Sequence, residues 1–269
     1  MESSDLLGIF VIHYSKLIDR RDFLGAVLRH QDRKAFWVTE KLFHNFESKV
    51  STSKKILGVS ERLVGMDLGI NSRSTTRSRR KARIEGKILF FRSFLSRNNT
   101  FSTGSLPPRQ SHPVTIEVQK MHLTALKLGL EQRKNWILVL EDDAVPMDDA
   151  FVKIDEIIKV RAPINTWISL NSGAGLLRTK SEVFVDHFGL FRVKPASTRC
   201  AVAYLVSADL AQKILRSASE EGVPNWLPID FYYQVMLRKF KSKSYWADPP
   251  YFSQGSETGQ FESTFAHLR

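Results

Sequence analysis

The chain is short of cysteine and of long hydrophobic runs, and each shortage excludes a class of protein. A single cysteine, Cys200, stands among 269 residues. No internal disulfide can therefore form, which excludes a disulfide-stapled scaffold and favours a reducing compartment. The apolar runs, such as residues 136–140, fall far below the roughly 20 residues of a membrane-spanning helix. Glycine and proline number 14 and 10, which is too few for a collagenous or low-complexity chain.

The first residues also lack the basic stretch that opens a secretory signal. Asp5 stands where such a signal carries Lys or Arg. We therefore expect no signal peptide, and a cytoplasmic protein that can meet the inner face of a membrane peripherally.

Positive charge is in excess and is locally concentrated. Lys and Arg outnumber Asp and Glu by 40 to 28, for a net charge of +12. Such an excess favours polyanionic partners: nucleic acid, an anionic membrane surface or phosphate-bearing small molecules. Residues 71–83 hold six positive charges and no acid. We expect a solvated loop insertion there, either a plain surface loop or a patch that faces anions or a membrane.

Short apolar runs alternate with amphipathic segments along the rest of the chain. The runs are continuous and rich in β-branched residues, which is typical of strands buried on both faces of a parallel sheet. We predict strands at residues 6–12, 36–39, 136–140, 167–170 and 201–206. We predict helices after the first strand and at residues 115–132, 148–160, 207–217 and 228–238. The alternation predicts one α/β domain over residues 1–269 with a mainly parallel sheet and an irregular C-terminal cap from about residue 246.

The strongest chemical feature is the sequence WILVLEDDAVP at residues 136–146. A buried strand ends there in Glu141, Asp142 and Asp143, and ligands of open α/β sheets bind beyond the carboxyl ends of strands. Adjacent carboxylates stay ionised together most easily when a cation compensates them, and oxygen ligands suit Mg²⁺ or Mn²⁺. The alternative is an acidic loop that stabilises the N-terminus of the next helix. The triplet alone leaves both interpretations open.

Four segments, in order along the chain, resemble glycosyltransferase family 25, the group of bacterial lipooligosaccharide and collagen galactosyltransferases. They are residues 9–24 (IFVIHYSKLIDRRDFL), 118–146 (with VLEDDAVP), 198–215 (TRCAVAYLVSADLAQKIL) and 227–237 (LPIDFYYQVML), followed by the tail PPYFSQGSETG. The chain departs from the family where Met121 precedes His122, because the family usually has Ser before that His. The basic stretch at 71–83 has no counterpart that we can place.

The resemblance implies a GT-A fold, which is a Rossmann-like nucleotide-sugar-binding domain, and an inverting reaction. A Mn²⁺ or Mg²⁺ ion held by Asp143, with Glu141 or Asp142, would then neutralise the departing nucleotide diphosphate. The implied donor is a nucleotide sugar, with UDP-galactose the family's commonest. The implied acceptor is a glycan or a lipooligosaccharide-type, lipid-linked saccharide. Single-displacement inversion needs one base and no covalent nucleophile.

Six further residues are candidates for this site, four of them with a plainer alternative. Asp230 is the candidate base, or else an acid favoured at a helix N-terminus. His122 either contacts the carboxylates or the donor, or is a structural core histidine. The others are Arg20 and Arg21 as donor contacts, with solvated surface arginines as the alternative, and Gln254 and Ser256 as donor or acceptor contacts.

Other functions remain open at this stage. The charge and the Arg-rich stretch suit a nucleic-acid-binding protein, although no zinc-finger or RNP pattern is present, so we expect no specific nucleic-acid partner. Clustered carboxylates also serve metal-dependent phosphodiesterases, but a second acidic and lysine cluster is missing. A catalytically dead scaffold is disfavoured by the intact triplet.

Overall fold

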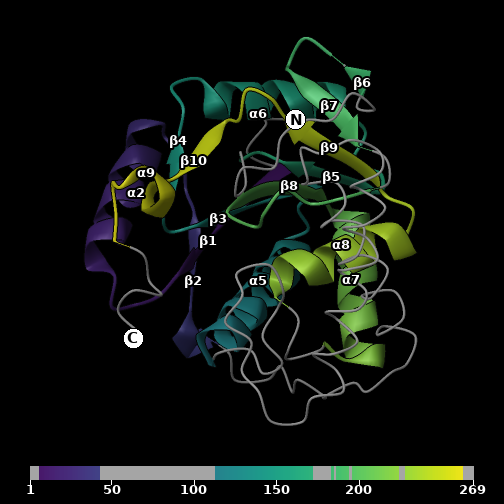
Figure 1. Cartoon of the computed structure of the whole chain (residues 1–269), viewed down its shortest axis with the longest axis horizontal. Helices are drawn as coiled ribbons and strands as arrows, with labels where there is room; N and C mark the ends of the chain where they lie inside the picture. The colour runs from purple at the N-terminus through teal and green to yellow at the C-terminus, as the bar shows by residue number, and fades with distance from the viewer. Residues whose placement is uncertain are drawn as a thin grey trace, which may run out of the picture.

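The computed structural model describes residues 6–42, 113–171, 183–184, 186–193, 196–223 and 228–262. The basic stretch at 71–83 lies outside the described residues. Within them, no helix is both long enough and apolar enough to cross a membrane. Figure 1 shows the described elements arranged around one central sheet.

That sheet has eight strands in the order β2-β1-β3-β8-β5-β9-β7-β6. Their bounds are β1 Leu7–His13, β2 Phe36–Thr39, β3 Trp136–Glu141, β5 Thr166–Ser169, β6 Val183–Phe184, β7 Leu190–Val193, β8 Ala203–Ser207 and β9 Lys243–Ala247. The β1 strand pairs in parallel with β2 and β3, and β5 pairs in parallel with β9. Only β8 and β7 run against the other strands of this sheet. The predicted α/β class with a mostly parallel sheet is therefore confirmed.

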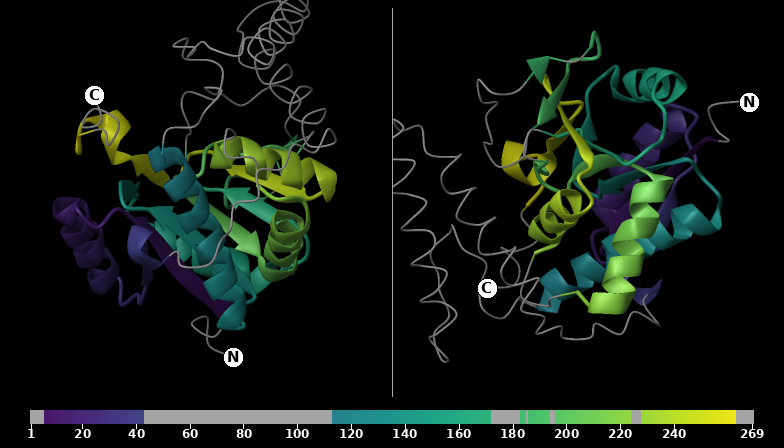
Figure 2. Two further views of the ribbon diagram at one scale, coloured as in Figure 1. Left: turned by 90° about the horizontal axis from the view of Figure 1, so that it is seen from below. Right: turned by 90° about the vertical axis from the view of Figure 1, so that its right-hand side faces the viewer.

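Helices cover both faces of the sheet. One face packs against α5 (Pro113–Glu131), α7 (Ala208–Glu221) and α8 (Ile229–Lys239). The other packs against α2 (Ile18–His30) and α6 (Ala150–Val160). The view from below in Figure 2 shows α5 and α7 lying in front of the strands. The 3-10 turn η1 (Glu40–Leu42) follows β2.

The apolar runs of the sequence form the strands because both sheet faces are covered. All seven residues of β1 are buried, as are the first five of β3. Alternate side chains therefore enter two separate cores, one on each side of the sheet. Ile137 and Val139 face the α5 side, whereas Leu138 and Leu140 face the α6 side. This two-sided burial fixes where β3 ends, and with it the position of the acidic triplet.

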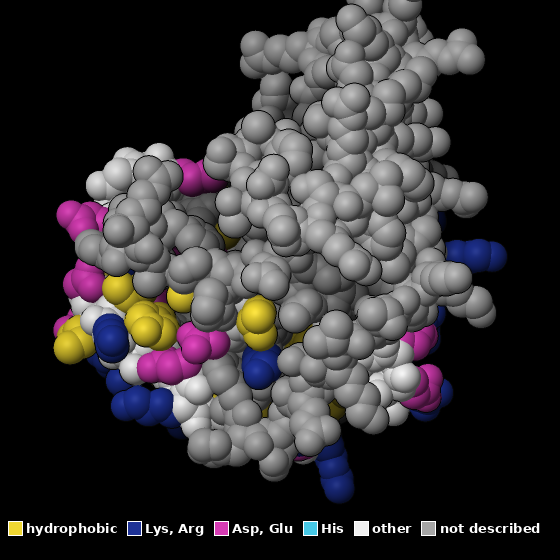
Figure 3. All heavy atoms as spheres, turned by 60° about the horizontal axis from the view of Figure 1, so that its bottom comes forward, with side chains coloured by type: hydrophobic (Ala, Val, Ile, Leu, Met, Phe, Trp, Pro, Cys, Tyr) yellow, Lys and Arg dark blue, Asp and Glu magenta, His cyan; other side chains and the backbone are white. Residues whose placement is uncertain are grey.

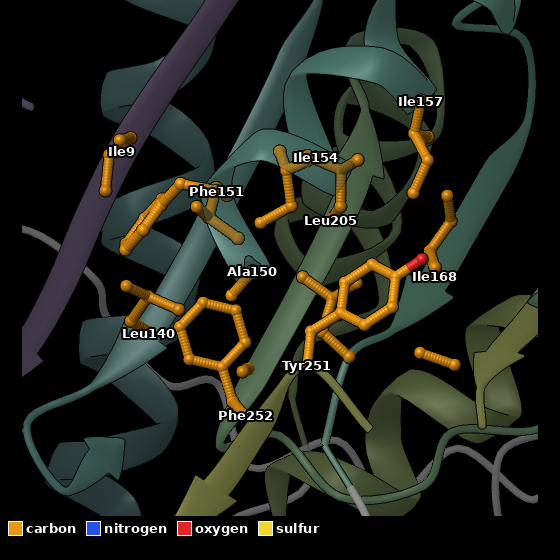
Figure 4. Close-up of a cluster of buried hydrophobic side chains, with 14 of the residues drawn as sticks. Ile9, Leu140, Ala150, Phe151, Ile154, Ile157, Ile168, Leu205, Tyr251 and Phe252 are labelled. Carbon is orange, nitrogen blue, oxygen red and sulfur yellow. The ribbon is translucent and has the colours of Figure 1, made fainter. Parts of the chain in front are cut away.

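The C-terminal tail is more regular than we expected. It contains β10 (Phe252–Gln254) and the single-turn helix α9 (Gly255–Thr258), and β10 pairs antiparallel with β4 (Ala144–Pro146). Figure 4 shows Tyr251 and Phe252 pointing into the core below α6. The rings of Phe252 and Phe151 meet edge to face, with centroids 5.8 Å apart. Aromatic anchors thus hold the tail directly beside the end of β3.

Candidate active site

The three acids that end β3 and begin the following turn have different partners. Asp142 has partners on both carboxylate oxygens: Arg20 Nη1 donates to its Oδ1 at 3.0 Å, and its Oδ2 lies 3.0 Å from His13 Nδ1. The backbone N–H of Tyr14 also donates to Oδ2, at 3.3 Å. Both oxygens of Asp142 are therefore engaged inside the protein, and this carboxylate ties β1 and α2 to the end of β3.

Asp143 is held by the tail. Ser256 Oγ donates to its Oδ2 at 2.6 Å, Gln254 Nε2 donates to the same oxygen at 3.3 Å, and Gly255 N donates to its backbone carbonyl at 2.8 Å. The other oxygen, Oδ1, is buried and has no hydrogen-bond partner among the residues that the structure describes. Asp143 is only 3% exposed, and a buried carboxylate oxygen without a donor is costly. The arrangement leaves one fixed acceptor unpaired.

Glu141 begins a buried chain of polar groups. Its Oε1 lies 3.2 Å from His122 Nε2, and His122 Nδ1 lies 3.0 Å from the Tyr204 hydroxyl. That hydroxyl lies 3.0 Å from the Tyr233 hydroxyl. The chain joins β3, α5, β8 and α8, and it orients both ring nitrogens of His122.

Burial sets the protonation of this chain. It lowers the pKa of His122 to about 4, against the opposing charge of Asp230. Burial, together with the charges of Asp143 and Asp142, raises the pKa of Glu141 to about 8, although Arg20 opposes the rise. The imidazole is therefore neutral at pH 7, and its contact with Glu141 is a hydrogen bond rather than an ion pair.

Asp230 lies in the first turn of α8 on the same side of the sheet. Burial, reinforced by the charge of Glu141, raises its pKa to about 6, and His122 opposes the shift. Its Oδ2 is 3.8 Å from Cys200 Sγ, and its backbone carbonyl accepts a hydrogen bond from Thr198 Oγ1. A carboxyl group that titrates near pH 6 suits a general base at neutral pH.

The two candidate arginines lie in different environments. Arg20 is 4% exposed, bonds Asp142 and lies 4.0 Å from Asp143 Oδ2. It also donates to the backbone carbonyl of Glu262 in the tail. Arg21 is exposed and lies over the Trp37 ring, 5.5 Å from the ring centroid. The structure thus brings Arg20 to the acids and leaves Arg21 on the surface of α2.

Two residues of this arrangement, His13 and Tyr204, are not among the candidates from the sequence. His13 belongs to no local motif. Tyr204 lies in an apolar strand, where an aromatic residue normally packs in a core. The signal for His13 was its place as the last residue of a buried strand, where ligands of α/β sheets gather.

The three acids do not form one metal-binding group. Among the described residues, no set of three or more His, Cys, Asp or Glu side chains is arranged to hold a metal ion. Mg²⁺ needs only one or two protein carboxylates, because water and substrate phosphates fill its other positions. The unpaired Oδ1 of Asp143 fits such a role, whereas Asp142 has no free oxygen. The residues present therefore fit a cation shared mainly with substrate.

Comparison with known proteins adds no family. No protein-family model matches the chain, and no curated protein matches it.

Proposed function

We propose that this chain is a metal-dependent inverting glycosyltransferase of GT-A fold that transfers a hexose from a UDP-sugar to a saccharide acceptor. One observation carries the proposal: a buried, unpaired carboxylate oxygen of Asp143 stands at the carboxyl end of a central strand. A second carboxyl group with its pKa raised to about 6, that of Asp230, lies on the face of the sheet that also holds Glu141. The order of the sequence segments that resemble family 25 supports the same conclusion.

Each residue then has a distinct task. Asp143 would hold the divalent cation, and Gln254 and Ser256 fix its carboxylate through Oδ2. The cation would supply charge compensation for the leaving nucleotide diphosphate. Arg20 neutralises Asp142 and so keeps the buried turn from repelling the donor's phosphates.

Asp230 is the base. It accepts the proton of the acceptor hydroxyl as that oxygen attacks the anomeric carbon, and the bond to the diphosphate breaks with inversion. The neutral His122, held by Tyr204, keeps Glu141 in one orientation beside this path.

The test is the cation dependence of nucleotide binding. We expect UDP to raise the melting temperature of the wild type only with Mn²⁺ or Mg²⁺ present, since a ligand that binds only the folded state stabilises it. Asp143→Asn should abolish that shift. The matched control is Asp148→Asn, because Asp148 is an exposed carboxylate in the same connection between β3 and α6.

Two results would count against the proposal. One is full cation-dependent UDP binding by Asp143→Asn, which would remove Asp143 from the site. The other is steeply salt-dependent binding of oligonucleotides with no response to UDP, which would favour a nucleic-acid binder.

A further inference from the structure

Asn171 is a buried amide whose polar atoms have no partner among the described residues. It is 1% exposed, and within that part of the chain neither Oδ1 nor Nδ2 forms a hydrogen bond. Two residues earlier, Ser169 Oγ accepts hydrogen bonds from Trp167 Nε1 and the backbone N–H of Arg199. The buried hydroxyl of Ser169 is thus satisfied, whereas the amide of Asn171 is not. Such a group in a native protein calls for a water or a ligand.

The register places Asn171 at the same edge of the sheet as Glu141. Glu141 N donates to Val202 O at 2.7 Å, and Leu170 N donates to Ala203 O at 2.9 Å. The chain that enters β8 is therefore flanked by the end of β3 on one side and the end of β5 on the other. Figure 1 shows β5 and β8 side by side within the sheet.

Asn171 lies two residues beyond Ser169, where β5 ends. Along the strand, Trp167 belongs to the core beneath α5 and α8 together with Tyr204, whereas Ile168 and Leu170 belong to the opposite core. The bridge partner of Asn171, Phe252, also belongs to the core beneath α6. Asn171 therefore stands where the chain leaves the sheet, between the end of β5 and the tail.

The tail passes on the far side of Asn171. Asn171 forms a parallel bridge with Phe252, which in turn pairs with Pro146 of β4. Two residues farther along β10, Gln254 reaches Asp143. Asn171 therefore stands between the segment that leads to the proposed cation ligand and the strands that lead to the proposed base.

We propose that Asn171 binds a pair of neighbouring hydroxyl groups on a sugar ring, and that it helps to select which sugar the site accepts. A primary amide offers donors and an acceptor side by side, and each sugar hydroxyl offers one donor and acceptor positions, so the two groups are complementary. A site built to hydrogen-bond a substrate hydroxyl discriminates strongly against a substrate without it, because the buried group is then left unpaired. The inference rests on the proposed function, since that function supplies the sugar.

The experiment compares Asn171→Leu, Asn171→Ser and Asn165→Ser with the wild type. Leu keeps the approximate shape of Asn without polar atoms, and Ser covers the case in which Leu does not fold. Asn165 is the matched control, because it is a second asparagine with a buried, unpaired amide oxygen and precedes the amino end of the same strand. The probes are UDP, UDP-galactose and UDP-glucose, each with Mn²⁺ by calorimetry, and methyl β-galactoside by ligand-detected NMR.

We expect both Asn171 variants to bind UDP as the wild type does, and to lose about 10- to 100-fold in affinity for the UDP-sugar that the wild type prefers. Asn165→Ser should bind every probe normally. If binding of the UDP-sugars is unchanged but binding of the methyl galactoside is lost, the amide serves the acceptor ring rather than the donor ring, and the proposal stands.

The inference and the proposed function can fail separately. Wild-type affinity of the Asn171 variants for all sugar probes would overturn the inference. The inference would also be overturned if the wild type bound UDP with Mn²⁺ but no saccharide. That result would still agree with a nucleotide-binding site. The third result is a wild type that binds the methyl galactoside but no UDP, with Asn171 variants that bind neither. This result would reject the proposed function and support the inference.

Discussion

The half-buried carboxyl group of Asp230 shows how one residue can affect both stability and reactivity. Burial and the charge of Glu141 raise its pKa to about 6, so the folded state binds this proton more tightly than the unfolded chain does. The stability it contributes is therefore present at acid pH and is lost as the pH rises through about 6. At pH 7 the group is ionised in surroundings that disfavour its charge, which is the condition that the proposed role as a base requires.

Asp230→Asn should separate these two effects. The amide cannot ionise, so we expect the variant to be more stable than the wild type at pH 7, by roughly 3 kcal/mol, and nearly as stable as the wild type near pH 3. Sugar transfer should fall by about 10²- to 10⁴-fold. Denaturant unfolding at both pH values and nucleotide-release assays measure the two quantities.

Asp209 is the control of opposite sign. Burial alone would raise its pKa, but hydrogen bonds from Ser207 and the backbone N–H of Asn165 outweigh burial and lower it. Asp209→Asn should therefore lose stability at pH 7 and approach the wild type at low pH. If Asp230→Asn instead lost stability at pH 7, as Asp209→Asn does, the surroundings of Asp230 would stabilise its charged form. That outcome would contradict the raised pKa of Asp230.

At the scale of elements, the sequence predicted those helices and strands whose residue pattern is evident within the segment itself. Residues 36–39 were predicted as a strand and form β2, and the helix predicted at 148–160 begins at Ala150 and ends at Val160. The strands β7, β9 and β10 were missed. Their runs are short and interrupted by charged or polar residues, so only pairing with distant strands makes them regular.

In the candidate site, too, the sequence predicted what is local and missed what depends on distant residues. The acids were evident because three of them follow a buried strand. Their partners were not all evident, because the bond between Arg20 and Asp142 spans 122 residues and that between Ser256 and Asp143 spans 113. No local pattern encodes the unpaired amide of Asn171 either, since it becomes unusual only when both flanking strands are in place.

The pairing of β10 with β4 gives a prediction at this scale. Phe252 is fully buried against Phe151, so Phe252→Ala should cost about 3–5 kcal/mol of unfolding free energy. It should also weaken cation-dependent UDP binding, because it loosens the segment that carries Gln254 and Ser256. Calorimetry at a temperature where the variant is still folded measures the second effect.

Leu210→Ala is the comparison for Phe252→Ala. Leu210 is as deeply buried, but it lies on α7 in the other core. It should lose stability and keep nucleotide affinity. Equal losses of UDP affinity in both variants would mean that the tail has no particular role in holding Asp143.

At the scale of the whole molecule, the net positive charge comes mainly from one stretch of sequence. Residues 43–112 hold 14 Lys and Arg against four Asp and Glu. In the view of Figure 3, by contrast, Lys and Arg side chains of the described residues are interspersed with Asp and Glu. The described side chains visible in this view therefore form no broad basic patch, and the basic stretch at 71–83 is the place to test for anion binding.

We predict that replacing Arg77, Arg79, Arg80 and Lys81 with Ser weakens binding to vesicles containing phosphatidylserine by roughly 10-fold or more, since each basic residue near an anionic surface contributes about 1 kcal/mol. Sedimentation with vesicles at low and high salt measures this. The control replaces four exposed bases on separate helices or turns: Lys16, Arg29, Lys127 and Lys159. Equal vesicle binding by both sets would reject a membrane-facing role for the stretch.

The contacts of Asp143 with Gln254 and Ser256 also have a consequence for synthesis on the ribosome. Every strand of the central sheet ends by Ala247, yet these two side chains follow it in the sequence. A nascent polypeptide can therefore assemble its sheet before the turn after β3 gains its last support. Under the proposed function, products released early, before Ser256, would resemble the native protein by spectroscopy and still fail to bind a nucleotide.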